Sequence, residues 1–175
     1  MNYRNKIFLI LFLGILLLFS QSSLENSQYV GTTSEKISVD LVRIVDGDTL
    51  VVRINNKEEK VRIIGIDTPE SVRPNYPVEC FGTASFEYIE FLIGNNELFL
   101  EFDETQGMRD RNGRLLAHVF VQDINIGERM IADGYAYEYT YDTPYIYQAD
   151  YQKVEQTAQN QDKGLWSPET CNGSV

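Results

Sequence analysis

The chain has 175 residues, with 26 acidic and 15 basic side chains and a formal net charge of −11. This length suits one domain with its own hydrophobic core and is too short for two ordinary domains with a linker. The acidic balance is typical of a well-solvated surface and argues against nonspecific binding of polyanions. Any nucleic-acid function therefore has to come from a local arrangement of side chains.

The first 22 residues do not read as part of a folded domain. Arg4 and Lys6 precede an apolar run at residues 7–19, which is shorter than the ~20 residues of a membrane-spanning helix. This layout predicts a secretory signal peptide, with an N-terminal membrane anchor as the alternative because no A-x-A cleavage site follows. Either interpretation predicts an exported protein, secreted or held on the outer face of the membrane. Residues 23–36, which are poor in apolar side chains, are predicted to form a flexible leader.

Three predicted strands open the domain at Ile37. Runs rich in β-branched residues flank an Asp-Gly turn, and the turn "NNK" at 55–57 leads into a third run. The expected strands span residues 37–45, 49–54 and 60–66. Their short connections predict an antiparallel meander.

A helix is predicted next, at residues 81–93, because Phe81, Ala84, Tyr88 and Phe91 recur near helical spacing as a buried face. Further along the chain we expect two strands, at 97–103 and 114–121, and a short helix at 126–134.

The last predicted helix begins at a Thr143 cap with Pro144 in its first turn, and it ends before Gly164. Five short strands with a helix between the third and fourth indicate an α+β protein. Its core is predicted to be a five-stranded OB-type β-barrel with three helices, spanning residues 37–168, with a mixed α+β sheet as the alternative.

The two cysteines of the chain, Cys80 and Cys171, lie far apart in the exported part. A disulfide is favoured over a metal site, which needs more ligands at closer spacing. The bridge is predicted to tie the C-terminal tail, residues 169–175, to the domain. In the chain-entropy model it stabilises the fold by on the order of 4 kcal/mol.

Two short acidic motifs follow predicted strands. Asp46 and Asp48 flank Gly47 in "RIVDGDTLVV", and Asp67-Thr68-Pro69-Glu70 follows the strand "VRIIGI". Each motif taken alone is also an ordinary turn sequence. Hard cations such as Ca²⁺ prefer several oxygen ligands, and a meander can bring two strand-end aspartates together.

Arginines are the other unusual feature. Arg62 lies within an apolar strand, either as an edge residue whose charge reaches water or as a group directed at a ligand. Arg109, Arg111 and Arg114 cluster in "MRDRNGRLL", which is either a solvated loop or a phosphate site suited to guanidinium groups. Together with the aspartates and Glu70, these residues are the components of metal-assisted phosphodiester cleavage.

"DGDT", the arginine of "VRIIGI", "DTPE", the "GRLLA" strand start and the late "GLW" resemble the staphylococcal nuclease (thermonuclease) family in order and spacing. The resemblance covers about Ile37 to Trp166. It implies a calcium-dependent endonuclease of DNA and RNA that acts as a monomer and favours single-stranded or unpaired regions. Cleavage of the bond to the 5′ oxygen leaves a 3′-phosphate.

The resemblance also implies a role for each site residue. Asp48, Asp67 and the backbone carbonyl of Thr68 are the Ca²⁺ ligands. Asp46 lies next to these ligands and supports them without itself binding the ion. The general base is Glu70, and the scissile phosphate is contacted by Arg62 and Arg114. The substrate-binding residues implied are Arg111, Tyr139 and Tyr141.

The assignment makes one geometric demand. In a straight strand Arg62 and Asp67 have opposite parity and face opposite sides. A bend between them is therefore expected, and Gly65 is placed to allow it.

This chain also departs from the family. Asn112 stands where many members have a tyrosine, Arg111 replaces a lysine, and Arg73 is the one cation of a loop that is lysine-rich in the best-known member. With the acidic net charge, these differences predict weaker and more salt-sensitive substrate capture.

Tyrosines recur with period two at residues 135–141, and others follow at 145, 147 and 151. Such a row either stacks on unpaired bases or packs as one face of an extended segment. His118, in the middle of a predicted strand, is expected to have a packing role.

The predicted function is a secreted, calcium-dependent nuclease. A noncatalytic OB-type module that binds nucleic acid or protein is the main alternative, and it predicts loss of catalytic residues, whereas Arg62, Glu70 and Arg114 are all present. An acidic Ca²⁺-binding surface protein without a nucleic-acid role is a third possibility.

Overall fold

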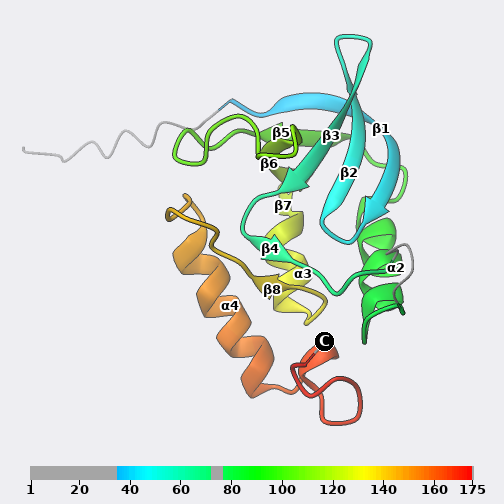
Figure 1. Ribbon diagram of the computed structural model, residues 1–175, viewed down its shortest axis with the longest axis vertical. Coiled ribbons are helices and arrows are strands. Elements are labelled where there is room, and N and C mark those ends of the chain that lie inside the picture. The colour runs from blue at the N-terminus through cyan, green and yellow to red at the C-terminus, as the bar shows by residue number, and fades with distance from the viewer. Residues whose placement is uncertain (1–34, 72–76, 175) are drawn as a thin grey trace, which may run out of the picture. The chain divides into compact units, whose positions relative to one another are not determined.

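The computed structural model describes residues 35–71 and 77–174 (Figure 1). The predicted signal peptide or anchor lies outside the described residues, as do most of the leader and Arg73. Over the described part of the chain, no helix has both the length and the apolar character needed to cross a bilayer.

Five strands close into a barrel (Figure 1). The first three form the expected antiparallel meander, the next two pair antiparallel with each other, and the fourth of the five also pairs with the first. A parallel pairing of the third with the last closes the ring. The barrel strands are β1 Ile37–Asp46, β2 Thr49–Ile54, β3 Lys57–Ile63, β5 Leu98–Glu101 and β6 Leu115–Val121. The predicted α+β barrel is therefore confirmed.

Local backbone chemistry explains the curvature of the meander. Asn55 and Asn56 both adopt positive φ, 50° and 64°, as a tight hairpin turn between twisted strands requires. The β1–β2 register shifts twice, between Leu41 and Arg43 and between Ile44 and Asp46. Such irregularities bend a strand and allow a sheet to curl on itself.

The strand expected at 60–66 is in fact interrupted. β3 begins earlier, at Lys57, and ends at Ile63, and Ile66–Asp67 forms a separate strand β4 paired with β8, Tyr137–Glu138. The break falls at Gly65, whose φ of +82° suits glycine. A Cβ there would lie only 2.5 Å from Cζ of Tyr145, so no other residue fits without a shift.

The described residues contain three α-helices, as predicted: α2 Gly82–Ile93, α3 Ile126–Ala132 and α4 Gln148–Asn160. Helices α2 and α3 pack against barrel strands, and α4 packs against α3. The short strand β7, Ile124–Asn125, leads into α3, whose first turn is capped by the Asn125 side chain. A 3₁₀ turn, Gly164–Trp166, follows α4.

Two details of the predicted helices are wrong. The buried stripe of α2 is Ser85, Ile89 and Ile93, whereas Phe91 is 76% exposed, because the β-branched residues at i, i+4 spacing meet the core.

The start of α4 also differs from the prediction, since Thr143 does not cap it and the N-cap is Tyr147. Thr143 and Pro144 are engaged by Gln106 and Thr105 of the β5–β6 connection instead. These contacts keep the preceding segment out of the helix.

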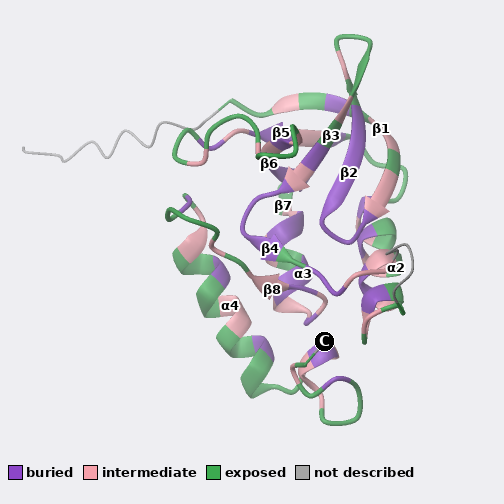
Figure 2. Cartoon of the chain, in the orientation of Figure 1, coloured by how far each residue is buried: buried purple, intermediate pink, exposed green. Residues whose placement is uncertain are grey.

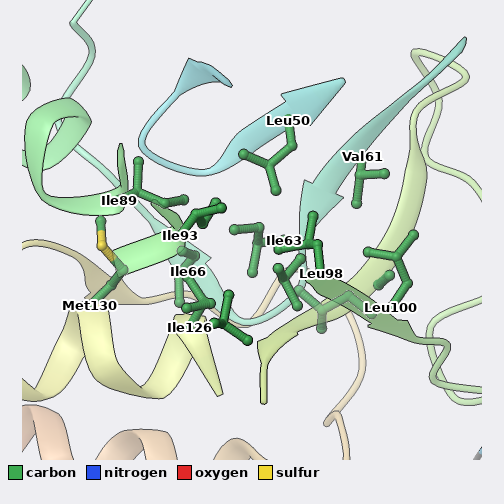
Figure 3. Close-up of a cluster of buried hydrophobic side chains, with 14 of the residues drawn as sticks. Leu50, Val61, Ile63, Ile66, Ile89, Ile93, Leu98, Leu100, Ile126 and Met130 are labelled. Atoms are coloured by element: carbon green, nitrogen blue, oxygen red, sulfur yellow. The ribbon is translucent and has the colours of Figure 1, made fainter. Parts of the chain in front are cut away.

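The hydrophobic core lies inside the barrel and continues beneath α2 and α3 (Figure 3). Figure 2 shows buried residues along β2 and on α3. Large, fully buried side chains there come from strands and helices alike: Leu50, Ile63, Ile66, Ile89, Ile93, Leu98, Leu100, Ile126, Met130, Ile131 and Tyr151. Each such side chain contributes roughly 1.5–3 kcal/mol on burial.

A disulfide joins Cys80 to Cys171 across a sequence separation of 91 residues, with the Cα atoms 5.9 Å apart. It connects the segment just before α2 to the C-terminal tail, where sequence analysis had placed it.

His118 is fully buried in β6 against the ring of Tyr147, at 4.7 Å between centroids. Its Nε2 atom lies 3.6 Å from Oδ2 of Asp103. The other contacts of that carboxylate are hydrogen bonds from the Ile146 N–H, at 2.9 Å, and from the amide and hydroxyl of Thr105. Burial opposes ionisation of Asp103, but the imidazole and these hydrogen bonds hold its pKa well below the ordinary range.

Replacing Asp103 by Asn is expected to lower the free energy of unfolding at pH 7 by roughly 1–3 kcal/mol, because both carboxylate oxygens accept hydrogen bonds whereas the amide has only one acceptor oxygen. The depressed pKa makes the carboxylate's advantage fully present above about pH 4, and the advantage is lost as pH falls through the folded-state pKa. Urea unfolding at pH 7 and pH 3 measures both effects. Asp40→Asn, at an exposed position of β1, is the control, and equal midpoints for Asp103→Asn and wild type at pH 7 would contradict the prediction.

Candidate active site

The Asp-Gly turn between β1 and β2 packs against the segment that follows β4. A Cβ on Gly47 would lie 2.8–3.0 Å from side-chain atoms of Thr68, so only glycine allows this approach. Both aspartates of the turn, Asp46 and Asp48, are buried. Burial of two adjacent carboxylates requires partners for their charges.

The partners of the two aspartates differ. Oδ1 of Asp46 accepts hydrogen bonds from the Gly47 N–H and from the amide and hydroxyl of Ser71, the last at 2.7 Å. Asp48 instead accepts from the Thr49 hydroxyl at 2.8 Å and, more weakly, from the Thr68 N–H at 3.4 Å. Asp46 therefore fastens the segment after β4, while Asp48 faces Thr68.

Arg62 connects Asp48 to Asp67. Its Nη1 atom forms an ion pair with Oδ2 of Asp48, and Nη2 lies 2.7 Å from Oδ1 of Asp67. The Arg62 side chain is only 13% exposed, and its backbone pairs with both β2 and β6. It is thus not an edge residue reaching for water, and the break at Gly65 puts it on the same side as Asp67.

The site accumulates negative charge around Asp67. Partial burial raises the pKa of the Asp67 carboxyl above its ordinary value, and the nearby carboxylates of Asp48 and Glu79 add to this, whereas Arg62 opposes it. A cation beside these groups would relieve their repulsion.

The donors of this site are oxygen atoms, as Ca²⁺ prefers. Among the described residues, no group of three or more His, Cys, Asp or Glu side chains is arranged to hold a metal ion. Asp48 and Asp67 nevertheless share one guanidinium, and the buried Thr68 Oγ1 lacks a hydrogen-bond partner within the described chain. The residues fit a calcium ion bound through two carboxylates, with the remaining ligands drawn from backbone carbonyl and water.

The Arg114 guanidinium is held from two sides at the start of β6. Nε donates to Oδ2 of Asp110 at 2.7 Å, and Nη1 donates to the Thr49 hydroxyl at 3.3 Å. Asp110 also accepts from the Arg114 and Asn112 amides. Although burial opposes it, these contacts lower the pKa of Asp110. Because Thr49 also donates to Asp48, Arg114 lies on the same side of the barrel as the carboxylates.

The arginine cluster of this loop divides into three different environments. Arg109 donates to Oε2 of Glu59 and to the Gly113 carbonyl, at 3.0 and 2.7 Å. The Arg111 guanidinium lies 5.8 Å from the ring centre of Tyr141. Hydrogen bonds of Arg109 and Arg114 therefore hold this loop in place, unlike a freely solvated loop.

A cleft of about 550 Å³ adjoins these groups. Its lining includes residues predicted from sequence: Arg62, Asp67, Arg111, Asn112, Arg114, Tyr139 and Tyr141. Sequence reasoning did not single out Asp110, Gln106 or Asp142, which also line it. For Asp110 the available signal was an acidic residue four positions before Arg114.

The tyrosines of the row fall into two environments, exposed and buried. The rings of Tyr139 and Tyr141 are exposed at the cleft, 6.3 Å apart. Tyr145 and Tyr151, in contrast, are buried in the core. The packing interpretation therefore holds for Tyr145 and Tyr151, and stacking on bases stays a prediction for Tyr139 and Tyr141.

Glu70 lies three residues beyond Asp67 and is half-buried. Its backbone N–H donates to Oε2 of Glu79 at 2.8 Å. The structure joins Asp48, Arg62 and Asp67 by direct contacts and links Arg114 to Asp48 through the Thr49 hydroxyl. Asp46 contacts Ser71 instead, on the short segment that also carries Glu70.

A closed five-stranded barrel with carboxylates and arginines gathered beside one cleft defines an OB-fold protein of the nuclease-like class. The model of the staphylococcal nuclease homologue family matches residues 60–168. The chain belongs to the staphylococcal nuclease family.

Curated relatives agree with this membership. The chain is 34% identical over 127 residues to a thermonuclease of Staphylococcus hyicus, covering 73% of this chain and 74% of that protein. It is 35% identical over 151 residues to endonuclease YncB of Bacillus subtilis, covering 82% and 70%. The SPbeta prophage-derived endonuclease YokF of the same organism is 38% identical over 136 residues, which cover 76% of this chain and 45% of YokF. The resemblance read from the motifs is confirmed, and with it the prediction of a nuclease-type hydrolase.

Proposed function

We propose that this protein is a secreted, calcium-dependent nuclease that hydrolyses phosphodiester bonds of DNA and RNA. The observation that carries the proposal is the Arg62 guanidinium placed between Asp48 and Asp67 at the edge of a cleft. Arg114 is linked to Asp48 through the Thr49 hydroxyl, which accepts from Arg114 and donates to Asp48. Paired carboxylates for a cation, with two guanidinium groups for a phosphate, suit phosphoryl transfer.

In the proposed mechanism, Asp48, Asp67 and the Thr68 carbonyl would hold a calcium ion, which would supply positive charge to the site, and Asp46 keeps the Thr68–Ser71 segment in place. Arg62 and Arg114 donate hydrogen bonds to the phosphate oxygens as charge builds on them.

Glu70 takes a proton from the attacking water, directly or through a water network. The water oxygen bonds to phosphorus as the bond to the 5′ oxygen breaks, and the 5′ oxygen then acquires a proton. The products are a 3′-phosphate and a 5′-hydroxyl. Arg111, Tyr139 and Tyr141 bind neighbouring parts of the substrate, where exposed rings suit unpaired bases.

The proposal of secretion rests on the N-terminal sequence, in which Arg4 and Lys6 precede an apolar run. The disulfide between Cys80 and Cys171 is compatible with an oxidising compartment. A monomer acting on extracellular nucleic acid is the simplest form of the proposal.

The deciding experiment is digestion of supercoiled plasmid and of single-stranded RNA by the folded protein, with Ca²⁺ or with a chelator. Cleavage of both substrates in Ca²⁺ alone is expected. Absence of Ca²⁺-dependent cleavage would overturn the proposal, and binding of single-stranded DNA without cleavage would favour the noncatalytic OB-type module.

Asp48→Ala is expected to weaken Ca²⁺ binding by at least about 10-fold. Even residues that only hydrogen-bond to a metal ligand contribute about 10–100-fold to metal affinity, and Asp48 is proposed to be a ligand itself. Asp48→Asn, which keeps the shape of the side chain, should show the same direction. Isothermal titration calorimetry measures the affinity. Asp40→Ala, an exposed carboxylate on β1, should bind Ca²⁺ as the wild type does, and unchanged affinity in both Asp48 variants would remove this residue from the site.

A further inference from the structure

The backbone of Glu70 is held by a residue that the proposed chemistry does not use. The Glu70 N–H donates to Oε2 of Glu79 at 2.8 Å, and the Glu79 N–H donates to the Glu70 carbonyl at 3.1 Å. Glu79 thus binds both the amide and the carbonyl of Glu70. We name this pair of hydrogen bonds the Glu70–Glu79 clamp.

The clamp completes a pattern along residues 68–71. The Thr68 N–H donates to Asp48 and the Ser71 N–H to Asp46, so both ends of the segment are fastened to the β1–β2 turn. Between them, the Glu70 N–H donates to Glu79, which lies just before α2 in the chain. Three carboxylates therefore fix the short segment that carries Glu70.

Helix α2 adds a steric constraint at the same point. A Cβ on Gly82, the first residue of α2, would lie 2.4 Å from the Glu70 carbonyl oxygen and 3.2 Å from Cα of Ser71. The Gly82 N–H in turn donates to the Glu79 carbonyl at 3.0 Å. Close backbone packing leaves the Glu70 backbone little room to shift toward α2.

Glu79 is itself anchored. The next residue, Cys80, is bonded to Cys171 in the C-terminal tail. The tail is fixed because the Gly173 N–H donates to the Leu165 carbonyl and the Leu165 N–H donates to Gly134, both at 2.9 Å. Leu165, to which the tail is hydrogen-bonded, is itself fully buried.

We propose that Glu79 is a positioning residue, which fixes the Glu70 backbone so that the Glu70 carboxylate acts from one conformation, with the Cys80–Cys171 disulfide as its anchor. The inference rests on the proposed function, since it requires Glu70 to be the general base. A catalytic group displaced by about 1 Å can lose 10²-fold in rate, so such a clamp matters for turnover.

The test compares Glu79→Ala, Glu79→Gln and Glu79→Asp in the Ca²⁺-dependent nuclease assay. Glu79→Ala removes the acceptor, and at saturating Ca²⁺, which offsets the loss of a carboxylate near Asp67, we expect kcat to fall about 10–100-fold with KM changed less than about 2-fold. Glu79→Gln keeps an acceptor oxygen at the same reach and should restore most of kcat. Glu79→Asp keeps the charge but shortens the side chain, and it should resemble Glu79→Ala.

Glu87→Ala is the matched control, because Glu87 is an exposed glutamate of α2. Its kcat should equal that of the wild type. Amide hydrogen exchange at Glu70 gives a second readout, with faster exchange expected in Glu79→Asp than in Glu79→Gln. If Glu79→Ala fails to fold, the Gln and Asp variants still decide the matter.

Two different failures can be told apart. If the wild type cleaves and Glu70→Gln is inactive, but Glu79→Ala and Glu79→Asp keep wild-type kcat, the positioning role is overturned and the proposed function stands. A Glu79→Gln variant as slow as Glu79→Asp would also overturn the role of the hydrogen-bond acceptor. If the wild type shows no cleavage, the proposed function itself fails.

Discussion

Replacing Glu70 by Gln is expected to lower kcat for DNA hydrolysis by about 10²–10⁴-fold, the usual contribution of a general base. The amide cannot take a proton from water, but it has nearly the same shape as the carboxylate. The backbone bonds between Glu70 and Glu79 should survive, since they involve no Glu70 side-chain atom. Steady-state cleavage of a short fluorescent oligonucleotide in saturating Ca²⁺ measures the loss.

Two controls make this result specific. Calorimetry should find Ca²⁺ affinity mostly unchanged in Glu70→Gln, because the proposed ligands are Asp48, Asp67 and the Thr68 carbonyl. Glu87→Gln, at an exposed position of α2, should leave kcat unchanged. Full activity of Glu70→Gln would require a different base.

Removing the disulfide with the double substitution Cys80→Ser and Cys171→Ser is expected to lower the free energy of unfolding by on the order of 4 kcal/mol in the chain-entropy model. The bond closes a long loop, 91 residues in sequence separation, and its loss gives the unfolded chain more freedom. Urea unfolding followed by tryptophan fluorescence reports the change through Trp166.

A reductant provides the comparison within this experiment. Added to the wild type, it should bring the urea midpoint close to that of the double variant, while the double variant itself should not respond. Intact-mass measurement should show the oxidised form in the purified protein. Two free thiols, or equal midpoints with and without the bond, would contradict the prediction.

The barrel was predictable because its information is local. β-branched runs separated by Asp-Gly and Asn-Asn turns specify a meander without reference to the rest of the chain. The pairing of β4 with β8 was not predictable in this way, because each strand is two residues long and only Gly65 and the Tyr145 ring make the break necessary. The exposed position of Phe91 likewise depends on which side of α2 meets the core.

The site shows the same division. The residue types of "DGDT" and "DTPE" identify carboxylates that a hard cation can use, and Arg62 is conspicuous inside an apolar strand. Contacts between segments remote in sequence carry no comparable signal. Ser71 binds Asp46 across 25 positions, and Arg114 reaches Thr49 across 65. Glu79 therefore emerged only from the fold, whereas Asp110 lies four positions before Arg114 and carries a local signal in the sequence.

The parallel pairing of β3 with β6 has a consequence for folding kinetics. The β1–β3 meander needs only tight turns, whereas Val61 pairs with Leu115, beyond α2 and β5 in the chain. Bringing such distant residues together costs loop-closure entropy before any contact compensates for it. Pairing of β3 with β6 is therefore expected to be slower than formation of the β1–β3 meander. Arg62 and Arg114 lie at that seam, so the two arginines proposed to contact the phosphate come together only when the barrel is complete.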